Sequence, residues 1–220
     1  MFLRRKNVSC GLTYETIPLS TPIENLDFVV FDTETTGFQV ATIDRIIEIG
    51  AVPIKGLEVL EFDTFQTYVN PNREIPQETI ELTSISNEQV EAAPQALEAM
   101  MSFFDFVQSR EAVCLVGHYV SFDVLALKSE FNREKLALKK IMTIDTLDLI
   151  GYIAPSHDMR DLERYAMAFG TRIYDRHSGL GDALTTAFLF TELLWQFKNR
   201  GYSTWGELIK ATDSQMRSLL

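Results

Sequence analysis

Acidic residues stand at points of the chain where strands end or helices begin. Asp32 and Glu34 are two residues apart at the end of the apolar run 28–31, and the period of two in a strand puts both side chains on one face of a sheet. Two neighbouring carboxylates repel each other unless a cation joins them. An isolated pair of this kind is more often a solvated strand end, so this motif alone is a weak signal.

Three further residues could complete an acidic site. Asp123 falls in the first turn of an expected helix, where the helix dipole by itself also favours a carboxylate. His177 and Asp182 are five residues apart in a glycine-bearing segment that leads into the longest expected helix. Each could be an ordinary surface residue or first-turn acid. Together, however, they come from the region where an open α/β sheet usually places its site, and this coincidence favours a shared function.

The residue types also predict the kind of cation. Four carboxylates without a matching cysteine cluster suit hard, oxygen-seeking ions, so we expect Mg²⁺ or Mn²⁺, two per site, and no structural zinc. In two-metal phosphodiester hydrolysis, a water activated by one ion passes its proton to a nearby base while the second ion stabilises the leaving oxygen. Of the three histidines in the chain, only His177 has the placement of such a base.

Composition limits the class of protein. With 220 residues and 46% hydrophobic content, the chain is long enough for one good-sized core. A net charge of −11 argues against a broad basic face for duplex nucleic acid, unless bound cations meet the phosphates. Cys10 and Cys114 are too few for a disulfide framework. Because neither a signal peptide nor a run of about 20 apolar residues is visible, we expect a cytoplasmic protein that makes no membrane contact.

The elements that must position these residues follow from apolar periodicity and capping signals. We expect strands over 28–31, 46–54 and 62–69, the last two as a hairpin around a turn at 55–56. A helix should run from a capping box at Ser86 and Gln89 to about residue 108, with Pro94 as a kink or break inside it.

Beyond that helix, strands and helices should alternate. The expected strands are 112–117 and 140–144, and the expected helices are 121–131, 145–150, 158–169, 181–198 and 204–211. Asp145 should cap the helix that it precedes. These elements predict an α/β fold with a mixed sheet covered by helices on both faces. We divide the chain into an N-terminal extension (1–26), a main domain (27–199) and a C-terminal helical extension (200–220).

Six stretches of sequence carry a family resemblance, in the order FVVFDTETTGF, DRIIEIGAV, LTSIS, GHYVSFDVLALKSEF, IDTLDL and HSGLGDALTTAFLF. They resemble the motifs of the DEDD exonucleases, which include the proofreading epsilon subunit of bacterial DNA polymerase III, over about residues 27–195. His177 is similar to the histidine of the DEDDh branch. The resemblance implies a ribonuclease H-like fold, with a mixed five-stranded sheet and helices on both faces, and 3′→5′ exonuclease activity.

Carried over position by position, the resemblance implies a role for each residue. Asp32, Glu34 and Asp182 would hold the first metal ion, and Asp32 would also bridge to the second. Asp123 would support the second ion partly through water. His177 would be the general base. These roles agree with the chemistry that the residue types suggest.

The resemblance further implies that the backbone around Thr35 and the ring of Phe122 contact the terminal nucleotide, the ring by stacking. Core packing explains Phe122 equally well. In two places the sequence departs from the family pattern, since Tyr119 follows His118 where the family usually has asparagine, and Ser84 stands where it usually has glycine. Tyr119 could narrow the pocket, stack on a base or simply pack.

The expected substrate is the 3′ end of a nucleic acid, DNA in preference to RNA, in single-stranded or frayed form. One alternative is an exonuclease of this family that trims short RNA. The other is a non-catalytic nucleic-acid or polymerase-binding module, whose mark would be a missing ligand, and none is missing. A set of basic residues could serve a strand end or could be a solvated face: Lys128, Arg133, Lys135, Lys139 and Lys140.

The last expected helix has an apolar face made by Tyr202, Trp205, Leu208 and Ile209. This face could dock on a polymerase, on a second copy of the chain or on the chain's own core. Of the three, packing on its own core is the interpretation that we favour.

Overall fold

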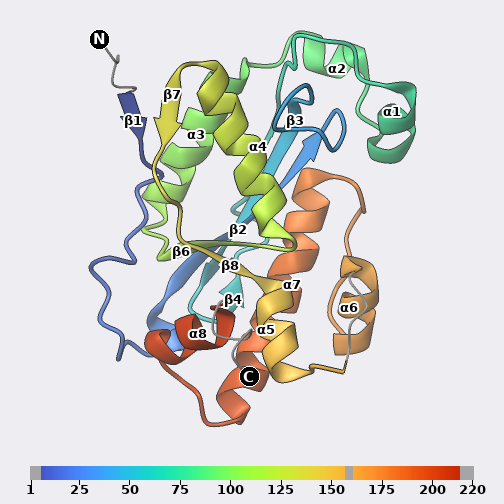
Figure 1. Ribbon diagram of the computed structural model, residues 1–220. Helices are drawn as coiled ribbons and strands as arrows, with labels where there is room; N and C mark the ends of the chain where they lie inside the picture. The colour runs from blue at the N-terminus through green and yellow to red at the C-terminus, as the bar shows by residue number, and fades with distance from the viewer. Residues whose placement is uncertain (1–5, 157–160, 214–220) are drawn as a thin grey trace.

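The computed structural model describes residues 6–156 and 161–213 and is built around one sheet with helices on both faces (Figure 1). The central strand β2 (Asp27–Thr35) runs antiparallel to β3 (Ile46–Lys55) and parallel to β6 (Cys114–Gly117). Strand β8 (Thr143–Asp145) continues the sheet in parallel beside β6. The predicted mixed sheet is confirmed.

The outer edge of β3 carries two short strands. β4 (Glu58–Val59) forms a tight hairpin with the end of β3, and β5 (Phe65–Tyr68) pairs with residues 48–51 of the same strand. Both occupy one position, so the sheet is five strands wide, in the order β4/β5, β3, β2, β6, β8. The expected strand 62–69 is shorter because a turn occupies residues 61–62.

Alternation along β2 explains why both faces of the sheet are covered. Phe28 and Val30 point into one buried apolar cluster, and Val29 and Phe31 point into another. A strand that is apolar on both faces must be covered on both. The two clusters hold the helices in place.

Eight α-helices surround the sheet within the described residues: α1 (Gln77–Thr83), α2 (Asn87–Glu91), α3 (Ala96–Ser109), α4 (Val120–Arg133), α5 (Thr146–Ile153), α6 (Leu162–Phe169), α7 (Gly179–Asn199) and α8 (Trp205–Thr212). Apolar residues of α3 and α4 fill the cluster on one face. Those of α5, α6, α7 and α8 fill the cluster on the other. Helices on both faces are thereby confirmed.

Several expected elements have different bounds. The helix expected over 86–108 is two helices, α2 and α3, separated around Pro94, and the capping box of Ser86 and Gln89 is confirmed. Residues 140–142 precede β8 without joining it. Helix α6 begins after its cap Asp161, and the expected start at 158–160 lies outside the described residues. Helix α1 was not predicted because its buried residues are threonines, which form no apolar stripe.

The described parts of both expected extensions, residues 6–26 and 200–213, pack on the rest of the chain. Strand β1 (Lys6–Val8) pairs in parallel with β7 (Leu136–Leu138), and neither strand was predicted. The backbone amide of Trp205 donates to the carbonyl of Thr21, and the Trp205 side chain is buried in the core. The apolar face of α8 is therefore covered by this chain itself. No helix among the described residues is long and apolar enough to cross a membrane.

Candidate active site

Three carboxylates meet at the end of β2. Asp32 and Glu34 are half-buried near the C-terminal end of this strand, opposite Gly50 and Glu48 of β3. Asp182 is buried in the first turn of α7. Each of the three offers an oxygen within 4.8 Å of the others. The structure thus brings together three of the residues that the sequence analysis selected.

Close contact between α7 and β3 makes this meeting possible. A Cβ atom on Gly50 would lie 2.1 Å from the backbone nitrogen of Leu180, so only glycine lets the helix approach. The backbone amide of Gly179 donates to Oε2 of Glu48 at 2.9 Å, and the Ser178 side chain caps the helix. The amino end of α7, which carries a partial positive charge, therefore points at the acids.

Asp123 approaches β2 from the face that α4 covers. Its Oδ1 accepts two hydrogen bonds from Thr33, one from the backbone amide at 2.9 Å and one from the hydroxyl at 2.6 Å. Burial raises the pKa of Asp123 to about 7, although the Thr33 hydrogen bonds oppose the shift. Asp123 is thus fixed beside the three clustered acids without belonging to that cluster.

The segment before α7 supplies two more groups. The backbone amide of His177 donates to Oδ2 of Asp182 at 3.3 Å, with His177 in the left-handed backbone region at φ 60°. The guanidinium of Arg176 forms an ion pair with Oδ1 of the same carboxylate. His177 was predicted as a site residue, whereas Arg176 was missed.

Burial and mutual repulsion raise the pKa values of the clustered acids. Burial, followed by the charges of Asp123 and Asp182, raises the pKa of Asp32 well above its usual range. Burial and the neighbouring carboxylates raise the pKa of Glu34 to about 8. Burial raises the pKa of Asp182 as well, while Arg176 lowers it. A bound cation would favour the charged form of every one of these groups.

The donor set fits a hard divalent ion. All the clustered ligand atoms are carboxylate oxygens, which Mg²⁺ and Mn²⁺ prefer. Such an ion would offset the unfavourable electrostatic energy of the neighbouring carboxylates. Within the described residues, this is the one cluster of metal-ligating side chains.

Glu48 is a further acid that the sequence analysis did not select. It is buried on β3, and its carboxylate accepts from the side-chain amide of Gln66 at 2.7 Å as well as from Gly179. Its contacts join β3, β5 and α7 beneath the clustered acids. A lone acid in the apolar run IIEIGAV was the available signal.

Two aromatic residues, one next to Asp123 in the chain and the other four residues after Glu34, form an aromatic wall. Phe122 is partly buried against the core, and its ring lies 6.2 Å from that of Phe38. Phe38, which the sequence analysis did not select, is 90% exposed. The Thr35 hydroxyl donates to the carbonyl of Gly37 at 2.8 Å and shapes the loop that carries Phe38. Phe122 thus packs on the core and also contacts the exposed ring of Phe38.

Both departures from the family pattern occupy left-handed backbone positions. Ser84 has φ 59° where it ends α1, and Tyr119 has φ 58° where it precedes α4. Glycine and asparagine adopt this conformation most easily, which accounts for the residue types usual in the family. Tyr119 is 43% exposed and packs edge-on against His118. Burial lowers the pKa of His118 to about 4.

Asp145 has the structural role that the sequence predicted. It caps α5 by accepting from the amide of Leu147, and it also accepts from the amides of Tyr119 and Val120. One carboxylate therefore ties the start of α4 to the start of α5.

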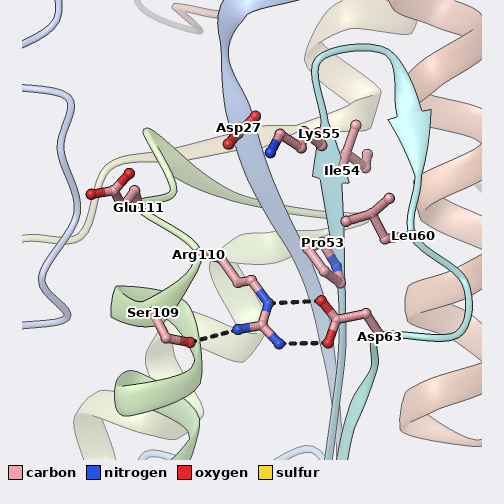
Figure 2. A pocket seen from close by; sticks show the side chains of 9 residues that line it. All are labelled: Asp27, Pro53, Ile54, Lys55, Leu60, Asp63, Ser109, Arg110 and Glu111. Atoms are coloured by element: carbon pink, nitrogen blue, oxygen red, sulfur yellow. Dashed lines mark hydrogen bonds and ion pairs between the residues drawn. The ribbon is translucent and has the colours of Figure 1, made fainter.

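A hollow of about 450 Å³ lies at the opposite end of β2 beside Asp27 (Figure 2). Arg110 lines this hollow, and its guanidinium donates hydrogen bonds to both carboxylate oxygens of Asp63 and to the Ser109 hydroxyl. Because these charges are already paired, this hollow is a poorer candidate than the acid cluster.

Known proteins with related sequences or folds confirm the family. The family model RNase_T, described as "Exonuclease", matches residues 29–190. A DNA polymerase III of PolC type from Caldanaerobacter subterraneus subsp. tengcongensis is 34% identical over 182 residues, which cover 83% of this chain and 12% of that protein. A DNA polymerase III epsilon-like protein from Rhodobacter capsulatus is 34% identical over 194 residues, covering 86% and 27%. The chain thus spans only a small part of these relatives.

Solved structures agree in fold. The nuclease domain of 3'hExo, a DEDDh family member solved with rAMP, superposes with a TM-score of 0.68 at 22% identity, covering 77% of this chain and 92% of that one. Exonuclease I gives a TM-score of 0.63 at 16% identity, covering 88% and 43%. The fold is thus ribonuclease H-like, with an acid cluster at the end of its central strand. The chain belongs to the RNase_T exonuclease family, of the DEDD group, and is similar to the epsilon subunit of DNA polymerase III.

Proposed function

We propose that this protein is a metal-dependent 3′→5′ exonuclease that hydrolyses phosphodiester bonds at single-stranded or frayed 3′ ends of DNA. The observation that carries the proposal is the cluster of Asp32, Glu34 and Asp182, whose oxygens lie within 4.8 Å of one another. The relatives named as DNA polymerase III proteins favour DNA as the substrate.

In this proposal Asp32, Glu34 and Asp182 bind one Mg²⁺ or Mn²⁺ ion, and Asp32 and Asp123 bind a second. When bound, such ions supply Lewis-acid stabilisation of the charge that develops on the phosphate. Thr33 keeps Asp123 oriented through its two hydrogen bonds. His177 accepts the proton of the attacking water as general base.

Aromatic stacking would hold the terminal nucleotide. Phe38 and Phe122 offer neighbouring ring surfaces beside the acids, and stacking tolerates any base. The backbone around Thr35 would contact the nucleotide next to them. We assign the activity to residues 27–199, with residues 1–26 and 200–220 as extensions.

The direct test is a time course with 3′-labelled and 5′-labelled DNA and RNA oligonucleotides in Mg²⁺, in Mn²⁺ and in EDTA. We expect metal-dependent release of mononucleotides from the 3′ end, faster on DNA. Asp32→Ala and Asp182→Ala should abolish release while the circular dichroism spectrum stays unchanged. Faster release from RNA would replace the DNA assignment by the RNA-trimming alternative. Absence of release in every condition would favour the non-catalytic module.

A further inference from the structure

Five exposed lysines form a strip beside α4, the helix whose first turn holds Asp123. We call them the lysine strip: Lys6, Lys128, Lys135, Lys139 and Lys140. Within residues 6–156 and 161–213, none of their ammonium groups has an ion-pair partner. Arg133, which the sequence analysis grouped with them, is instead paired with Glu130 and bonded to the carbonyl of Val40.

The outer face of α4 connects the active site to the strip. Ser121, Leu125, Lys128 and Asn132 are all exposed, and their spacing of four, three and four residues places them on one face of the helix. This stripe begins next to Phe122, at the aromatic wall, and leads to Lys135 just past the end of the helix.

The other lysines gather along the same side. Lys140 lines a hollow of about 720 Å³ together with Ser121 and Val124, so it lies near the first turns of α4. At the other end of the helix, Lys6 of β1 is paired in register with Leu136, which places it next to Lys135. Figure 1 shows β1 and β7 beside the end of α4 that is remote from the active site.

Backbone pairing holds the outer part of the strip in place. The amide of Lys139 donates to the carbonyl of Val8 at 2.8 Å, which extends the pairing of β1 with β7. The N-terminal segment therefore contributes Lys6, and its pairing with β7 fixes the backbone around Lys135 and Lys139. Acids border the strip at Glu15 and Glu134, and Asp148 and Asp213 line the hollow beside Lys140. An anionic ligand is thereby favoured along α4 rather than inside that hollow.

We propose that the lysine strip binds the phosphate backbone of a single strand whose 3′ end lies in the acid cluster. Residues 121–133 of α4 span about 18 Å, which matches about five phosphates at a stacked spacing of about 3.4 Å, and Lys135 follows two residues past the end of the helix. The chain has a net charge of −11, so most of its surface repels a nucleic acid. The lysine strip is a local region of positive charge that would attract the phosphates of a single strand. The inference rests on the proposed function only for the direction of the strand.

The test compares two double variants with equal loss of charge, Lys128→Ala/Lys135→Ala and the control Lys55→Ala/Lys210→Ala. Lys55 lies at the opposite end of β2 (Figure 2) and Lys210 lies on α8. Both pairs are placed on Asp32→Asn protein in EDTA, and binding of a fluorescent 12-nucleotide strand is measured by anisotropy over a range of salt. The strip variant should bind about tenfold more weakly, with a salt slope lower by about 1.4. The control pair should match the Asp32→Asn parent.

Equal affinities of the strip and control variants would overturn the inference, as would failure of the parent to bind the 12-mer in 50 mM salt. Strand length gives an independent readout in the active enzyme. The strip variant should raise KM for 12-mers much more than KM for trimers, which are too short to reach Lys135. Because the anisotropy measurement needs no turnover, a protein without exonuclease activity would still show the loss of binding in the strip variant. Conversely, if the enzyme is active and its strip variant has the same KM for 12-mers as the control variant, the lysine strip is refuted but the proposed exonuclease activity is not.

Discussion

The guanidinium of Arg176 forms an ion pair with the carboxylate of Asp182 inside the acid cluster. Both side chains are largely shielded from water, with 22% and 10% of their surfaces exposed. The positive charge of Arg176 also opposes the upward pKa shifts of Asp32 and Glu34. Arg176 therefore compensates part of the acid repulsion, and it occupies one of the two Asp182 oxygens that could bind a divalent ion.

Removing Arg176 should expose this competition. We expect Arg176→Ala to bind Mn²⁺ about tenfold more tightly, about 1.4 kcal/mol, because Asp182 is released and the acids repel each other more strongly. The metal-free variant should also melt at a lower temperature, since a buried carboxylate loses its partner. Titration calorimetry and thermal unfolding measure the two effects.

Arg172→Ala is the matched control, because Arg172 also pairs with a carboxylate, that of Glu61, but at an exposed position away from the cluster. Its Mn²⁺ affinity should equal that of the wild type. Unchanged affinity in Arg176→Ala would mean that the guanidinium does not compete for the metal.

Stability of the metal-free protein should fall as the pH rises. The pKa of Glu34 is raised to about 8 in the folded state, above its value of about 4.3 in an unfolded chain. Such a group binds more protons when folded, so its contribution is complete below pH 4 and is lost as the pH passes through 8. We expect the free energy of unfolding in EDTA to decrease by a few kcal/mol between about pH 5 and pH 8.5.

Two comparisons isolate the cause of this pH dependence. Glu34→Gln carries no titrating group at this position and should show a flatter profile in EDTA. Saturating Mn²⁺ should also stabilise the wild type most at high pH, because metal binding requires the deprotonated acids. A wild-type profile in EDTA that is level from pH 5 to pH 8.5 would contradict the raised pKa.

Gly50 should be intolerant of any side chain. Its added Cβ would lie 2.1 Å from the backbone of Leu180, so Gly50→Ala must push α7, and Asp182 with it, away from β2. We expect a loss of about 3 kcal/mol or more in stability and a loss of Mn²⁺ affinity.

Gly170→Ala separates displacement of α7 from general destabilisation. Gly170 has φ +68° but nothing within 4 Å of an added Cβ, so this variant should lose about 1 kcal/mol and keep its metal affinity. Equal Mn²⁺ binding by Gly50→Ala and Gly170→Ala would show that the close approach of α7 does not position Asp182.

Elements whose signals are local could be predicted from the sequence. The apolar run before Asp32, the capping box at Ser86 and the glycine-bearing start of α7 each predicted an element that the structure contains. The acids were recognised because they stand at the ends of such elements. Family motifs then grouped Asp123 with residues some 90 positions away in the chain.

Features that depend on tertiary contact were missed. In the sequence, Arg176 cannot be distinguished from an ordinary loop residue, because its ion pair with Asp182 forms only in the folded structure. Thr33 could not be linked to Asp123, because its hydrogen bonds join β2 to α4 across 90 residues. Strand β1 contains only three residues and exists by pairing with β7, so neither strand has a periodic pattern of its own.

His177 should be essential for turnover but not for metal binding. Its contact with Asp182 runs through the backbone amide, so the imidazole remains available for the proposed role of general base. His177→Asn keeps that amide and suits the left-handed backbone at φ 60°, yet offers no base. We expect kcat to fall by roughly 10² to 10⁴, with Mn²⁺ affinity within about twofold of the wild type in titration calorimetry. Asp182→Asn, by contrast, should lose both. If His177→Asn retained more than a tenth of the wild-type kcat, another group would have to take the proton from water.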